Sequence, residues 1–133
     1  MKATEASLRR AGITIVLLHV LITVVHSMAH SALYIYMSNW QNAYILIVIV
    51  VLPVVAALLL WRRRKGAYLI LFVSMLGSLL FGGYYHFVAP GPDNVAFLTD
   101  HTWTLPFQIS AALLAVTEAA GTIVGLLGFS RTQ

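Results

Sequence analysis

Two histidines one helical turn apart, His26 and His30, have the clearest spacing for chemistry in this sequence. On an α-helix, residues four apart lie ~40° apart around the axis, so both imidazoles face the same side. Both also lie in a long apolar stretch, where ionisable side chains are rare and mark functional sites. The pair therefore predicts one half of a site that binds a ligand or an ion.

A metal ion is the ligand that this spacing favours. Two histidines at i and i+4 hold the zinc of the zincin metalloproteases, but there a glutamate follows the first histidine, and here Ser27 does. Protease chemistry is therefore not predicted. We expect His86 to be the third ligand, with His101, Asp100 and Asp93 competing for the fourth position. Nitrogen and oxygen donors without thiolates suit zinc, copper(II) or iron(II).

Two other interpretations of these histidines stay open at this stage. Four-helix b-type cytochromes hold haem between axial histidines on facing helices, and His30 with His86 could do the same. Against haem, two histidines four apart on one helix would crowd a single macrocycle. Alternatively, the histidines are neutral and only form hydrogen bonds between helices, which contribute about 1 kcal/mol each in membranes.

A second pair of ionisable residues, His19 and Glu118, is expected deeper in the apolar region. A lone carboxyl in a bilayer is either neutral or paired. His19 and Glu118 come at similar estimated depths, which predicts an inner proton relay or inner metal ligands. The alternative is a neutral Glu118 that forms a hydrogen bond to Thr117 or to a backbone carbonyl.

The composition identifies the class of protein that must position these residues. The chain has 133 residues, of which 60% are hydrophobic and 9% charged, whereas soluble domains carry roughly a quarter charged residues. This indicates an integral membrane protein. There are no cysteines, which excludes disulfides, cysteine zinc sites, iron–sulfur clusters and thiol catalysis.

The apolar stretches predict an all-α fold, a single domain over residues 1–133. We expect four transmembrane helices in an antiparallel up-down bundle, since a span needs ~20 residues. Their predicted ranges are about 11–36, 43–61, 67–88 and 105–128. Polar or small residues form stripes on the first, third and fourth spans, so these spans are expected to face one another, with the second closing the bundle.

Eight basic residues fall in clusters between the apolar stretches: Lys2, Arg9, Arg10, Arg62, Arg63, Arg64, Lys65 and Arg131. Basic residues accumulate on the cytoplasmic side of membranes. Both termini are therefore predicted to be cytoplasmic in a cytoplasmic-type membrane, and the histidines to lie near the outer face. The net charge of +4 is thus explained by orientation in the membrane. The predicted partner is the lipid bilayer, and nucleic-acid binding is not predicted.

The sequence predicts a small membrane protein with a histidine-rich metal site, serving metal handling or metal-dependent redox chemistry. Two alternatives are a b-type haem protein and a non-catalytic accessory subunit of a larger membrane complex or homo-oligomer. Whether the chain is an enzyme does not follow from its residues.

Overall fold

The computed structural model describes residues 2–132, and every regular element in this range is helical. Two of the elements, η1 and η2, are π-helical, with one residue more per hydrogen-bonded turn than an α-helix. The elements in chain order are α1 (Lys2–Ala32), α2 (Asn39–Tyr44), η1 (Ile45–Val51), α3 (Leu52–Trp61), α4 (Ala67–Gly83), η2 (Tyr84–Val88) and α5 (Thr104–Thr132).

These elements join into four helical segments that are long and apolar enough to cross a membrane. The all-helical, multi-pass class predicted from the sequence is confirmed at this level. The segments are Thr4–Ala32, Asn39–Trp61, Ala67–Val88 and Thr104–Arg131. The first begins and ends earlier than the predicted range 11–36, and the third matches the prediction.

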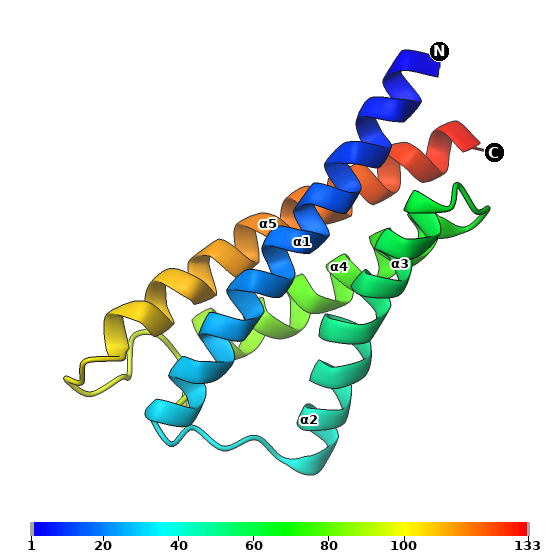
Figure 1. The fold of residues 1–133 in the computed structure, drawn as a ribbon. Coiled ribbons are helices and arrows are strands. Elements are labelled where there is room, and N and C mark those ends of the chain that lie inside the picture. The colour runs from blue at the N-terminus through cyan, green and yellow to red at the C-terminus, as the bar shows by residue number, and fades with distance from the viewer. Residues whose placement is uncertain (1, 133) are drawn as a thin grey trace.

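The chain runs back and forth along one long axis, as Figure 1 shows. Both termini and the basic turn at 62–66 lie at one end, which we call the terminal end. The connections 33–38 and 89–103 lie at the opposite end, the loop end (Figure 1). The other four candidate ligands also belong to segments at or near the loop end. These are His86, Asp93, Asp100 and His101.

The helices α1, α4 and α5 pack together, and small residues allow the closest approach. At Gly125 of α5 an added Cβ would lie 2.6 Å from the backbone nitrogen of Phe72 in α4. At Gly121 it would lie 2.7 Å from the Met75 side chain. Small residues on membrane helices permit such contact. The stripe predicted on the fourth span therefore faces the third helix.

The α2–η1–α3 segment closes the bundle on its remaining side, with Pro53 just after the π-helical turns. The Tyr44 hydroxyl donates a hydrogen bond to the Gly77 carbonyl of α4, at 3.2 Å. Pro53 has no N–H and cannot donate to the carbonyl of Ile49, four residues earlier. That carbonyl is left available to another helix.

Helix α1 ends at Ala32 in a Schellman motif that begins at His30. Tyr34 adopts a left-handed conformation with φ 54°, and the Ile35 N–H donates to the His30 carbonyl at 3.0 Å. The Tyr34 N–H donates to the Ser31 carbonyl, which completes the pair of bonds that defines this cap. Ile35 is then buried against Ala29. The cap therefore fixes the backbone of His30.

Candidate metal centre

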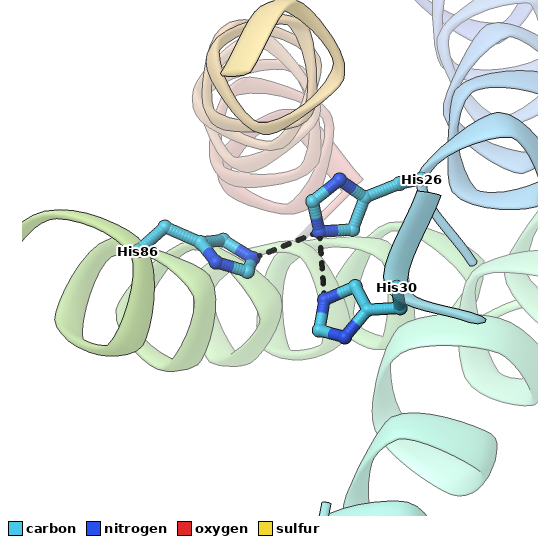
Figure 2. Close-up of side chains that lie close together, drawn as sticks. All are labelled: His26, His30 and His86. Carbon is cyan, nitrogen blue, oxygen red and sulfur yellow. Dashed lines mark hydrogen bonds between the residues drawn. The ribbon is translucent and has the colours of Figure 1, made fainter. Parts of the chain in front are cut away.

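Three imidazoles meet at the loop end of the bundle: His26 and His30 from α1 and His86 from η2 (Figure 2). The Nε2 atom of His26 lies 3.2 Å from Nε2 of His86 and 3.2 Å from Nε2 of His30. One ligand atom from each residue lies within 4.8 Å of the others. Within residues 2–132 this is the one group of three or more such side chains with metal-ligand spacing.

These distances match those between two ligands of one metal ion. Zinc binds imidazole nitrogen at ~2.0–2.1 Å in tetrahedral geometry, which places two such nitrogens ~3.3 Å apart. The 3.2 Å separations around His26 need almost no adjustment to accept an ion. Two of the three separations therefore have the spacing of a metal site, and all three ligand atoms lie within 4.8 Å of one another.

The second ring nitrogen of His86 is held by the loop that follows η2. Its Nδ1 lies 3.1 Å from the backbone carbonyl oxygen of Asp93. A carbonyl only accepts hydrogen bonds, so Nδ1 carries the hydrogen and donates. The loop is fixed in turn, because the Val95 N–H donates to the His86 carbonyl at 3.0 Å. In neutral His86, Nε2 therefore has a free lone pair that points into the cluster.

The second ring nitrogen of His26 is held by Ser110 of α5. Its Nδ1 lies 2.8 Å from the Ser110 Oγ, and that hydroxyl donates its single hydrogen to the Phe107 carbonyl at 3.0 Å. Oγ therefore accepts from Nδ1–H. Metal-binding histidines usually donate their other N–H to an oxygen in this way, which fixes the tautomer and the ring orientation.

The two tautomers create an electrostatic conflict that a cation resolves. Neutral His26 and neutral His86 present bare Nε2 lone pairs to each other at 3.2 Å, with no hydrogen between them. His30 Nε2 lies at the same distance from His26 and 3.1 Å from the Asp93 carboxylate, which only accepts, so a neutral His30 ring carries its hydrogen there and must shift it to Nδ1 to bind an ion. One proton can bridge two of these nitrogens, but a metal ion can bind all three.

Asp93 supplies negative charge beside the three rings. Its Oδ1 lies 3.1 Å from His30 Nε2 and 3.2 Å from His86 Nδ1, and both carboxylate oxygens are buried without a well-formed hydrogen bond. Burial raises the pKa of this carboxyl, but the His30 and His86 rings outweigh that effect and hold the pKa at about 2. Asp93 is therefore ionised at neutral pH and attracts a cation.

Phe107 of α5 is the apolar support of the cluster. Its side chain is fully buried, and its ring centroid lies 4.7 Å from that of His26, 5.1 Å from that of His30 and 5.5 Å from that of His86. Contact with all three rings limits their rotation. It also excludes water on that side, which strengthens electrostatic interactions inside the site.

The other two predicted loop ligands lie outside this group. Asp100 and His101 are both exposed, and His101 Nδ1 accepts a hydrogen bond from the Trp103 backbone N–H at 3.1 Å. That contact turns the His101 ring back onto its own loop. Of the three candidates for the fourth position, the structure brings only Asp93 to the histidines.

The predicted inner pair, His19 and Glu118, is brought together. His19 Nδ1 lies 3.8 Å from Glu118 Oε1, and both side chains are buried. His19 Nε2 lies 3.0 Å from the Ile49 carbonyl oxygen. Glu118 also lines the cavity that the histidine cluster borders.

A cavity of ≈ 340 Å³ connects the two groups of ionisable residues. The three clustered histidines and Asp93 line it toward the loop end, and Glu118 lines its inner part. The rest of the wall combines apolar side chains with hydroxyls: Thr23, Ser27, Ser31, Ile45, Ile49, Phe81, Ala111 and Leu114. Such a mixture is typical of a small-molecule or ion site.

Comparison of the chain with protein-family models, with curated proteins and with solved structures finds no match.

The sequence alone does not assign Phe107 or Ser110 to the site. Ser110 carried a signal, because it lies on the small and polar stripe of the fourth span. Phe107 carried none, because nothing separates it from the lipid-facing aromatic residues of the chain.

Proposed function

We propose that this chain is an integral membrane protein that binds one first-row transition-metal ion through Nε2 of His26, His30 and His86. One observation carries the proposal: the bare Nε2 atoms of His26 and His86 face each other at 3.2 Å, with His30 Nε2 equally close to His26. The oxygens of Ser110 and Asp93 on the opposite ring nitrogens are the usual second partners of metal-binding imidazoles.

The donor set narrows the ion to borderline divalent metals. Three imidazoles with a carboxylate or water as fourth ligand suit zinc, copper(II) or iron(II), and no thiolate is present to favour copper(I). Asp93 Oδ1, 3.1 Å from His30 Nε2, takes the fourth position. Zinc alone would indicate metal handling, and reversible copper or iron binding would indicate redox chemistry.

The geometry favours a single ion over haem. A porphyrin must fit between two axial rings, as His30 and His86 would provide. His26 Nε2 lies 3.2 Å from Nε2 of both of these residues, so its ring occupies the space that the macrocycle would need. Haem binding would require the cluster to open and His26 to leave it.

We further propose an antiparallel bundle with both termini cytoplasmic and the loop end at the outer face. The basic residues support this orientation, because they gather at the terminal end (Figure 1), and positive charge accumulates on the cytoplasmic side. The site would then receive its metal from outside. Homo-oligomers, or a larger membrane complex in which the chain is an accessory subunit, are compatible with the exposed apolar surface.

The test is metal binding by the full chain in detergent, with Zn²⁺ and with Co²⁺ as a coloured probe of geometry. We expect one ion per chain and an absorption spectrum of tetrahedral Co²⁺. Loss of a group that only forms a hydrogen bond to a metal-binding histidine weakens metal binding ~10–100-fold. His26→Ala and His30→Ala remove a ligand itself, so their metal affinity should fall by more than ~100-fold. His101→Ala is the matched control and should bind like the wild type.

Two results would contradict the proposal. One is a folded, metal-free protein that binds neither probe, in which case the three histidines are held only by hydrogen bonds. The other is a purified protein with a Soret band that shifts on reduction, which would establish haem. An equal loss of binding in His101→Ala would transfer the ligand role to the loop.

A further inference from the structure

His19 and Glu118 form a second buried group that the proposed metal site does not use. His19 projects from α1 and Glu118 from α5, with side-chain exposures of 0% and 4% and 3.8 Å between Nδ1 and Oε1. A buried carboxyl and a buried imidazole at this distance are either both neutral or an ion pair. The net charge of the pair therefore depends on how many exchangeable protons it holds.

The hydrogen-bond partner of His19 fixes which nitrogen faces the carboxyl. His19 Nε2 lies 3.0 Å from the Ile49 carbonyl, and a carbonyl only accepts, so Nε2 carries the hydrogen. Pro53 leaves that carbonyl available because it has no N–H to donate. The remaining nitrogen, Nδ1, is buried without a hydrogen-bond partner and faces Glu118.

These positions leave room for one exchangeable proton. With none, an anionic carboxylate faces a bare lone pair in a medium of low dielectric constant, which is costly. With one, on Glu118 or on His19 Nδ1, the pair has no net charge. With two, the pair is a buried cation. Two ligand atoms are too few for a metal site, which needs at least three protein ligands.

Glu118 borders the cavity that begins at the metal cluster. The titratable groups that face Glu118 are His19 from α1 and, on the far side of Gly82, His86 from η2; η1 contributes only aliphatic side chains. A Cβ at Gly82 would lie 3.6 Å from His86 Cδ2 and 3.8 Å from Glu118 Oε2, so only a glycine separates the two sites. Along α1, His19 lies seven residues from His26, about 10 Å.

We propose that His19 and Glu118 bind one exchangeable proton, which the pair releases into the cavity when a divalent cation occupies the histidine cluster. The inference rests on the proposed metal site. Two positive charges about 10 Å away, with little water between, favour the anionic form of the pair. The O–H bond of the Glu118 carboxyl breaks, and the proton passes through the cavity to the buffer. The protein thus couples metal binding to proton release.

The test counts protons during Zn²⁺ binding, by calorimetry of the full chain in buffers with different ionisation enthalpies. Metal binding releases protons wherever ligands must be deprotonated. We expect Glu118→Gln, which keeps the shape of the side chain, to bind one Zn²⁺ as the wild type does but to release about one proton fewer. Glu5→Gln, an exposed carboxyl near the N-terminus, is the control and should match the wild type.

The outcomes separate the two proposals. Equal proton release by wild type and Glu118→Gln overturns the proton site and leaves the metal site standing. Binding of two Zn²⁺ by the wild type and one by the variant would make Glu118 a metal ligand and also overturns it. A wild type that binds no ion contradicts the proposed function itself.

A measurement on the wild type alone guards against a variant that fails to fold. Infrared difference spectra with and without Zn²⁺ should show the carbonyl band of a protonated carboxyl disappear as the ion binds. An unchanged carboxyl region in the presence of bound Zn²⁺ would overturn the inference without any substitution.

Discussion

The two buried imidazoles His26 and His19 lie on the same stripe of α1, seven residues apart, yet their surroundings differ in one decisive respect. Each ring has one nitrogen fixed by an oxygen from another helix, Ser110 Oγ for His26 and the Ile49 carbonyl for His19. The nitrogen that remains on each ring is therefore different, Nε2 on His26 and Nδ1 on His19. Nε2 of His26 faces two further nitrogens, whereas Nδ1 of His19 faces one carboxyl.

This difference shows that the partner on the far side of a ring decides what the ring can bind. Three nitrogens that meet at one point suit a metal ion, and one lone pair opposite a carboxyl suits a proton. Under the two proposals, the same residue type on the same helix face performs two kinds of chemistry. Variants that change the far partner, rather than the imidazole, are the direct way to separate the two.

Asp93→Asn should have the largest effect among such variants. It keeps the backbone carbonyl that fixes His86 Nδ1 but removes the charge beside His30 and His86. Asparagine keeps a neutral oxygen for the fourth position but removes the carboxylate charge, so we expect Zn²⁺ affinity to fall by at least the ~10–100-fold typical of partners of metal-binding histidines. Competition with a coloured chelator measures the change. Unchanged affinity would mean that the carboxylate takes no part in the metal cluster.

Ser110→Ala should have an intermediate effect on the same cluster. The variant removes the acceptor of His26 Nδ1–H at 2.8 Å, so the ring is no longer held in the tautomer that exposes Nε2. Since Phe107 still restrains the ring, we expect a loss near the lower limit for such partners, about 10-fold. The chelator competition applies again. A loss greater than that of Asp93→Asn would reverse the proposed order of the two oxygens.

Pro53→Ala should have the smallest effect on metal binding and act only on the other region. It introduces an N–H that competes with His19 Nε2 for the Ile49 carbonyl. We expect the change in Zn²⁺ affinity to stay below about 10-fold, because the variant removes no ligand of the cluster and no hydrogen-bond partner of a ligand. Nitrogen NMR of the His19 ring should report a change of tautomer. A large loss of Zn²⁺ affinity would show that the two regions share structural support.

Much of the fold could be predicted because hydropathy and length decide which segments cross a membrane. The helical segment Ala67–Val88 coincides with the third predicted range, 67–88. The end of α1 could not be predicted, because its left-handed residue is Tyr34, where most such caps have glycine. Its start was also missed, because the polar first turns of the helix have no apolar signal.

The candidate site could be predicted as far as helix geometry reaches. Spacing on one helix placed His26 beside His30, and relative depth placed His86 level with them. The choice of Asp93 over Asp100 and His101 depends on how the loop folds back, through the bond from the Val95 N–H to the His86 carbonyl. No local pattern encodes that contact. Phe107 required knowledge of which face of α5 meets α1.

Because η2, Tyr84–Val88, is π-helical, the direction of the His86 side chain depends on the number of residues that precede it in this helix. A π-turn is an α-helix with one residue inserted, and such turns are frequent at functional sites. The Ala89 N–H reaches back five residues to the Tyr84 carbonyl. Removal of one residue before His86 would restore the α-helical register and swing that position by ~100°. An insertion or deletion in this helix would thus separate His86 from its partners.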